Sequence, residues 1–189
     1  IEYEVTNPHN HLEAFINILK QANIQFTPNP ISKVKRCLQA KENGINDGMI
    51  DRLSLSNSRI EAMAEGLKQI AELPDYVGNV MEEFSHKNGM KISKVRVPLG
   101  VIGIIFESRP NVTADAAALC LKAGNCVILR GGKEAINSNK AIVKIMREAI
   151  EKAGLPQDCI NLVEDTTRQS SIELMELTDY LDVLIPRGG

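Results

Sequence analysis

The chain has 189 residues, of which 43% are hydrophobic and 24% are charged, and its formal net charge is −2 at pH 7. This composition is typical of a globular protein and excludes collagen-like, coiled-coil and largely disordered chains. Because a nearly neutral chain creates no long-range field, we expect neither nucleic acid nor a membrane as a partner.

The first residues carry no basic segment followed by an apolar one, and no apolar run is long enough to span a bilayer. The four cysteines contain no Cys-x-x-Cys pair. We therefore expect a cytoplasmic protein with free thiols.

Three parts follow one another along the sequence. Residues 1–40 contain one predicted helix, His11–Ala22, before a Pro-rich break, and stay unassigned. Residues 41–92 form a predicted helical layer, since apolar residues recur at helical spacing from Ile31 to about Met81. Within it, Ser56–Ser58 supply N-cap chemistry and Pro74 stops the helix.

Residues 93–189 alternate between short apolar runs and helical patterns. Such alternation predicts right-handed βαβ crossovers and a parallel sheet with flanking helices, an α/β fold. The predicted strands are residues 100–106, 126–129, 160–163 and 180–185, and the predicted helices are residues 111–123, 137–153 and 170–177. Because ligands bind at the carboxyl ends of parallel strands, the candidate loops are 107–111, 130–133, 164–167 and 186–189.

The segment Arg130-Gly131-Gly132-Lys133 joins a strand to a helix with two small residues between two cations, which suits a phosphate. The alternative is an ordinary loop with two surface cations. The GxGxxG fingerprint is absent, since Gly100 and Gly103 lie inside a strand. Cations in place of an acidic residue favour NADP(H), although the neighbouring Glu134 argues against this.

The segment Glu107-Ser108-Arg109-Pro110-Asn111 follows the first predicted strand of the sheet. Arg109 can grip a carboxylate or a phosphate through two parallel hydrogen bonds. Alternatively the cluster is capping chemistry, with Asn111 as the N-cap of the next helix.

Other candidate residues indicate no site. Cys120 lies in an alanine-rich helix and Cys126 begins a core strand, so we interpret them as packing residues, with Cys37 and Cys159 at a helix and a loop edge. His9 and His11 have no third ligand nearby in the sequence, so no metal is predicted.

The motifs PLGVIGIIFESRPNV (residues 98–112) and GNCVILRGGKEA (residues 124–135) resemble the gamma-glutamyl phosphate reductase family, within the aldehyde dehydrogenase superfamily. The resemblance extends upstream through IDRL (residues 50–53) and RIEAMAEGL (residues 59–67), and downstream to LIPRGG (residues 184–189). It covers about residues 41–189, and the first forty residues depart from the family.

The resemblance implies a variant Rossmann domain, of which residues 93–189 are the first half. It implies a substrate or oxyanion site made of Ser108, Arg109 and Asn111. It implies NADPH-binding positions at Ile105, Phe106, Glu107, Arg130, Gly131, Gly132, Lys133, Glu164, Asp165, Thr166, Pro186, Gly188 and Gly189.

The family's reaction is the reduction of L-glutamyl 5-phosphate by NADPH to L-glutamate 5-semialdehyde, with phosphate release, in proline biosynthesis. It proceeds through a cysteine nucleophile that the resemblance places beyond Gly189, so we expect activity only in a longer chain. The resemblance also implies a homo-oligomer and an association with glutamate 5-kinase. Two alternatives are a non-catalytic nucleotide-binding or assembly module, and a dehydrogenase acting on another acyl phosphate or acyl-CoA.

Overall fold

The computed structural model describes residues 47–188, so the predicted helix His11–Ala22, the histidines His9 and His11, and Cys37 lie outside the described residues. Helices α3 (Asp47–Leu53) and α4 (Asn57–Glu72) come first, followed by an antiparallel hairpin of β1 (Val80–Ser85) and β2 (Lys91–Val95). The rest of the chain alternates between strand and helix. Its elements are β3 (Val101–Phe106), α5 (Pro110–Lys122), β4 (Cys126–Arg130), α6 (Ile136–Lys152), β5 (Ile160–Leu162), α7 (Arg168–Glu176) and β6 (Val183–Arg187).

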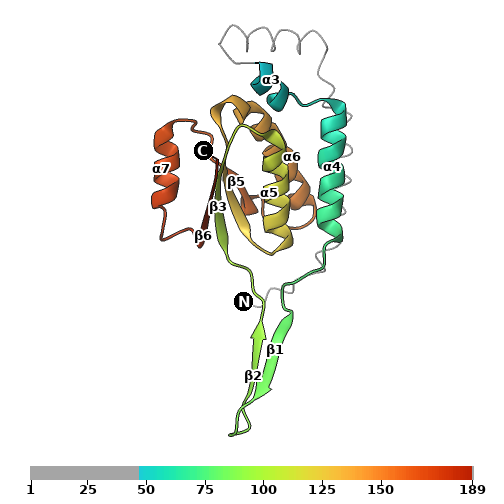
Figure 1. Cartoon of the computed structure of the whole chain (residues 1–189), viewed down its shortest axis with the longest axis vertical. Helices are drawn as coiled ribbons and strands as arrows, with labels where there is room; N and C mark the ends of the chain where they lie inside the picture. Colours follow the sequence, from blue (N-terminus) through green and yellow to red (C-terminus); the bar gives the residue numbers. More distant parts are fainter. Residues whose placement is uncertain (1–46, 189) are drawn as a thin grey trace.

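Strands β3 to β6 form one parallel sheet in the order β5-β4-β3-β6. The first two crossovers step from β3 to β4 and from β4 to β5, and the third returns past both strands to place β6 on the free side of β3. Since right-handed crossovers that run in opposite directions put their helices on opposite faces, α5 and α6 lie on one side of the sheet and α7 on the other (Figure 1). The predicted α/β class with a parallel sheet and flanking helices is confirmed.

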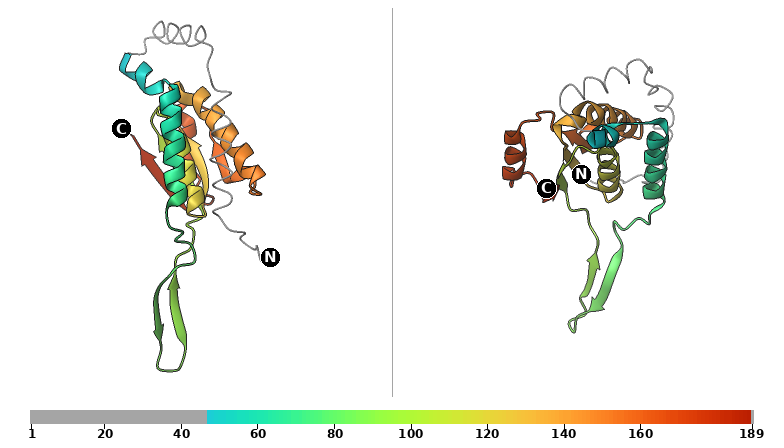
Figure 2. Two further views of the ribbon diagram at one scale, coloured as in Figure 1. Left: turned by 90° about the vertical axis from the view of Figure 1, so that its right-hand side faces the viewer. Right: turned by 45° about the horizontal axis from the view of Figure 1, so that its top comes forward.

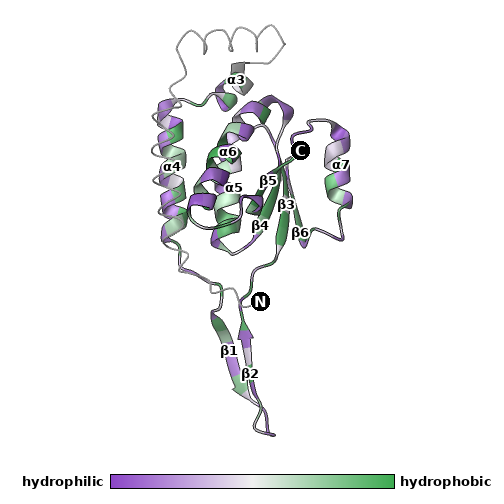
Figure 3. Ribbon diagram, turned by 180° about the vertical axis from the view of Figure 1, so that it is seen from behind, coloured by the Kyte–Doolittle hydropathy of each residue, from purple (hydrophilic) through white to green (hydrophobic). Residues whose placement is uncertain are grey.

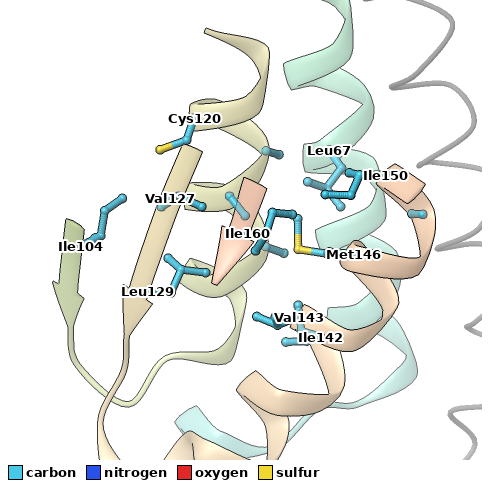
Figure 4. Close-up of a cluster of buried hydrophobic side chains, with 14 of the residues drawn as sticks. Leu67, Ile104, Cys120, Val127, Leu129, Ile142, Val143, Met146, Ile150 and Ile160 are labelled. Carbon is cyan, nitrogen blue, oxygen red and sulfur yellow. The ribbon is translucent and has the colours of Figure 1, made fainter. Parts of the chain in front are cut away.

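The core lies between the sheet and the layer of α5 and α6 (Figure 4). Val127 and Leu129 of β4 are fully buried, because this strand has a neighbour on each edge and a helical layer over its face. On α5, Ala114, Ala117 and Ala118 are also fully buried, and their short side chains allow close packing. Helix α4 covers α5 from outside and inserts Leu67 into the same core.

The boundaries of α4 follow the predicted signals. The Ser56 hydroxyl accepts a hydrogen bond from the Arg59 backbone N–H at 3.3 Å, and the helix ends at Glu72, two residues before Pro74. Helix α5 ends at Lys122, shortly before Gly124, and α6 at Lys152, shortly before Gly154, as the glycine signals predict.

The helical pattern does not reach Met81, however, because residues 80–95 form the β1–β2 hairpin, which projects away from the sheet (Figures 1 and 2). The sequence analysis missed it for a physical reason. All six residues of β1 and four of the five in β2 are exposed, so neither strand shows the apolar alternation of a half-buried strand. Figure 3 shows the contrast between the mixed hydropathy of this hairpin and the largely hydrophobic strands β3 and β4.

Among residues 47–188, none of the helices combines the length and the apolarity that crossing a membrane requires.

Candidate functional site

A cleft of about 450 Å³ lies at the carboxyl ends of β3 and β6, where the direction of the crossovers reverses. This topological switch is where open parallel sheets bind ligands. Four arginines contribute to the cleft, from α3 and from the ends of three different strands. The lining comprises Arg52, Ile105, Phe106, Glu107, Ser108, Arg109, Arg130, Gly132, Glu134, Pro186, Arg187 and Gly188.

Gly132 and Ser108 bring the loops after β4 and β3 into contact. A Cβ atom on Gly132 would collide with Ser108 Oγ and would lie 2.9 Å from the Ser108 backbone nitrogen. The Ser108 hydroxyl donates a 2.5 Å hydrogen bond to Glu134 Oε2, and this bond, more than any other contact, holds the pKa of the Glu134 carboxyl below its usual value. Gly131 is equally confined, since a Cβ atom there would collide with Asn139 Nδ2 and lie 3.1 Å from the Phe106 ring. Both glycines therefore serve loop packing, whether or not a ligand approaches them.

Arg130 joins two of the candidate loops. Its guanidinium donates to the carbonyl of Gly131 at 3.0 Å and to those of Thr166 and Thr167 at 3.1 and 2.9 Å. Its Nε is buried and has no partner among the described residues. Arg130 is thus positioned by protein carbonyls and still contributes its charge to the cleft.

Five of the predicted cofactor positions do not line this cleft: Gly131, Lys133, Glu164, Asp165 and Thr166. Glu164 forms a 2.6 Å ion pair with Lys140 of α6. Asp165 accepts hydrogen bonds from the backbone N–H and the hydroxyl of Thr167 at 2.8 and 3.0 Å, which lower the pKa of its carboxyl and organise the start of α7. Gly189 lies outside the described residues.

The structure corrects the alternative role of Asn111 as a helix N-cap. Helix α5 begins at Pro110, so the N-cap position belongs to Arg109, whose side chain makes no capping hydrogen bond. Proline fits the first position of a helix because its missing N–H would have no partner there. Asn111 lies in the first turn and donates to Asp115 Oδ2 at 3.4 Å, while Arg109 Nε lies 3.6 Å from Glu107 Oε2.

Sequence reasoning missed three charged residues of the cleft: Arg52, Glu134 as part of its wall, and Arg187. Arg52 and Arg187 lie inside the quoted motifs IDRL and LIPRGG, so the signal was present. Because these motifs carry the resemblance to the family, their arginines could have been selected as candidate site residues.

The described cysteines lie away from the cleft. Cys126 begins β4 and Cys159 directly precedes β5, so both are at the amino ends of their strands, opposite the cleft. Burial raises the pKa of Cys120 to about 11, and burial together with the neighbouring Cys126 raises that of Cys159 to about 11. Neither property suits a thiolate nucleophile. Within residues 47–188, no three His, Cys, Asp or Glu side chains lie close enough together to hold a metal ion.

A sequence profile described as "Aldehyde dehydrogenase family" matches residues 38–182. The chain belongs to the aldehyde dehydrogenase family. Two curated relatives called gamma-glutamyl phosphate reductase come from Geobacillus sp. (strain WCH70) and Clostridium novyi (strain NT). The first is 53% identical over 149 residues and the second 50% identical over 175 residues. These alignments cover 79% and 92% of this chain but only 36% and 42% of the two relatives. The chain therefore spans well under half of the length of these relatives.

Solved structures agree with this assignment. A crystal structure of gamma-glutamyl phosphate reductase from Thermotoga maritima matches with a TM-score of 0.89 and 37% identity, covering 98% of this chain and 45% of that one. The alignment with the Clostridium novyi relative covers 92% of the chain and so includes residues before position 41, whereas the family profile begins at residue 38.

Proposed function

We propose that this chain supplies the cofactor-binding part of an NADPH-dependent gamma-glutamyl phosphate reductase of proline biosynthesis. The reaction would convert L-glutamyl 5-phosphate, NADPH and a proton into L-glutamate 5-semialdehyde, NADP⁺ and inorganic phosphate. The observation that carries the proposal is the arginine-lined cleft at the topological switch, in a chain about half identical to reductases of that name.

The residues at the strand ends fit an anionic dinucleotide. Arginines 52, 109, 130 and 187 gather positive charge around the cleft, and Arg130 keeps a buried Nε without a partner among the described residues. Gly132 and Gly188 contribute the backbone of two loops to the lining. Phosphates are held well by such combinations of guanidinium groups and backbone. NADPH, when bound, would supply the hydride.

Arg109 would act on the substrate side of the cleft. The end of β3 and the Pro110 helix start fix its backbone at the carboxyl edge of the sheet. Its planar guanidinium can hold a phosphate or a developing oxyanion in a bidentate geometry. Ser108 and Asn111 would donate to the same ligand only after turning from Glu134 and Asp115, to which they donate in this structure. Lysine would retain the charge but lose the two-point geometry.

The nucleophile that the family's reaction requires is not among Cys120, Cys126 and Cys159, given their positions and the raised pKa values of Cys120 and Cys159. We therefore propose that the 189-residue chain alone binds ligands without turnover. We also propose a cytoplasmic homo-oligomer with an association to glutamate 5-kinase. The exposed Val80, Phe84 and Met90 of the hairpin region support a protein partner there.

The test is a chimera in which residues 38–182 replace the matching part of the Geobacillus relative. It should reduce NADP⁺ in the presence of glutamate semialdehyde and phosphate. In it, Arg109→Lys should lower kcat/KM at least about tenfold, or roughly 1.4 kcal/mol of transition-state stabilisation. The matched control is Arg147→Lys, because Arg147 of α6 pairs with the exposed Asp158 and does not line the cleft. A folded chimera that binds NADPH but has no activity supports the non-catalytic module instead.

A further inference from the structure

A second cleft, of about 560 Å³, lies between α4 and the start of α5. Two of its lining residues, Arg52 and Arg109, also line the cofactor cleft, so the two spaces meet at this pair of cations. Away from that junction the second cleft is bounded by Arg59, Met63, Gly66 and Asp115. A ligand whose reactive end lies at the junction would therefore extend its other end toward Asp115.

Asp115 is an unusual residue for its position. It lies on α5 among alanines that are buried in the core, and its own side chain is half-buried. Its one side-chain hydrogen bond in the described part of the chain is the 3.4 Å contact from Asn111, which is at the upper limit of hydrogen-bonding distance, and it forms no ion pair there. Burial raises the pKa of this carboxyl, with Asn111 and the charge of Arg187 acting in the opposite direction.

Gly66 keeps the space in front of Asp115 open. It lies in the middle of α4, where glycine costs a helix about 1 kcal/mol relative to alanine. The nearest atom to a Cβ built at this position is Asp115 Oδ1, at 3.9 Å. A side chain larger than alanine at position 66 would thus occupy the volume beside the carboxylate.

Arg59 and Arg52, two cations of the second cleft, differ in what they contact. The Arg59 guanidinium donates to the Asp51 carboxylate at 2.9 Å and to the Ser54 carbonyl at 3.0 Å, which fixes α3 against α4. Arg52 has no ion-pair partner among residues 47–188. The cleft therefore presents one carboxylate and several guanidinium groups within a single space.

We propose that the second cleft binds the α-amino acid end of the substrate, with Asp115 accepting the α-ammonium group and the arginines holding the anionic groups. A zwitterionic head with an anionic tail matches this distribution of charge. A plain dicarboxylate has no ammonium group to offer to the Asp115 carboxylate. The junction cations Arg52 and Arg109 then face the acyl phosphate, next to the cofactor. This inference rests on the proposed function where it identifies the anionic tail as an acyl phosphate. The recognition of the ammonium group by Asp115 does not depend on that function.

The experiment compares L-glutamate with glutarate, which has the same two carboxylates and no amino group, by calorimetric or NMR titration of the 189-residue chain. The wild-type chain should prefer L-glutamate. Asp115→Asn should weaken L-glutamate binding at least about tenfold while changing glutarate binding by less than about twofold. Gly66→Leu, which retains the carboxylate but fills the space, should weaken both ligands. The matched control is Glu61→Gln, an exposed carboxylate elsewhere on α4.

An equal loss of both ligands in Asp115→Asn, an absence of preference for L-glutamate, or no L-glutamate binding at millimolar concentration would overturn the proposal. Titration with adenosine 2′,5′-bisphosphate separates it from the proposed function. If this nucleotide does not bind but L-glutamate binding depends on Asp115, the cofactor assignment fails and the amino acid site stands. If the nucleotide binds and the Asp115 result fails, the reverse holds.

Discussion

The Thr113 hydroxyl donates a 2.9 Å hydrogen bond to Oδ1 of Asn139, and both side chains are completely buried. The bond joins α5 to α6 beneath the loop that carries Gly131 and Gly132. Asn139 Nδ2 has no partner among the described residues, so the hydrogen bond from Thr113 is the one side-chain contact that compensates for burying this amide. The loop at the end of β4, which lines the cleft, therefore rests on a buried polar contact between the two helices.

Thr113→Val should destabilise the chain by about 1–3 kcal/mol, because it leaves the buried Asn139 oxygen without a donor. Asn139→Leu should cost a similar amount. The double variant should lose less than the sum of the two, since it removes both polar groups together. Urea unfolding of the four chains measures the coupling, and strictly additive losses would contradict the importance of the bond.

Gly100 tests a different constraint, at the start of β3. Its φ is +122°, and a Cβ atom would collide with Asp182 Oδ2 and lie 2.7 Å from Asp182 Cγ. This carboxylate cannot move away without losing its 2.8 Å hydrogen bond from the Val101 backbone N–H. Gly100→Ala should therefore cost more than about 2 kcal/mol.

The control for Gly100 is Gly154→Ala, at φ +86° with no atom within 4 Å of the added Cβ. It carries a positive φ, closer to the left-handed region than that of Gly100, without the collision and should cost only about 1 kcal/mol. Thermal unfolding of both variants decides the matter. Equal losses would show that the Asp182 contact contributes nothing.

The Cys120 thiol should titrate far above neutral pH. A chain in which Cys37, Cys126 and Cys159 are serine leaves Cys120 alone, and its reaction with a disulfide reagent should rise with a midpoint near pH 11, the pKa of about 11 that burial imposes. Unfolding in urea should speed the reaction at pH 8 at least about tenfold.

The same pKa shift makes stability depend on pH. Because the pKa of Cys120 is higher in the folded chain than in the unfolded chain, the thiol of the unfolded chain loses its proton first, and stability should fall as pH rises above about 9. Fast native labelling at pH 8 would reopen Cys120 as a nucleophile.

The sequence predicts buried strands and helix ends well, and it predicts exposed strands and long-range loop contacts poorly. Strands β3 and β4 are buried, so their apolar runs mark them directly, and the glycines after α5 and α6 mark the helix ends. The β1–β2 hairpin lacks such a signal because its side chains are exposed on both faces. Arg130 contacts the carbonyl of Thr166, which lies 36 residues later in the chain, in the loop after β5. No local sequence pattern encodes how that loop packs against Arg130.

Arg130 and Lys133 should have different effects on nucleotide binding, although the sequence treats them as one pair of cations. Arg130 donates to the carbonyls of Gly131, Thr166 and Thr167, so Arg130→Ala should lower the thermal stability and weaken adenosine 2′,5′-bisphosphate and 5′-AMP alike. Lys133 is exposed and forms no ion pair within residues 47–188, so its ammonium group is available to a 2′-phosphate. Lys133→Ala should therefore weaken binding of the bisphosphate by roughly 10- to 100-fold, the equivalent of about 1.5–3 kcal/mol for one charge-assisted contact, and leave 5′-AMP binding and stability nearly unchanged.

Calorimetric titration of both variants with both nucleotides gives the four affinities. If Lys133→Ala weakens the two nucleotides equally, the lysine holds the shared 5′-phosphate, and the proposed preference for NADPH must arise elsewhere in the protein.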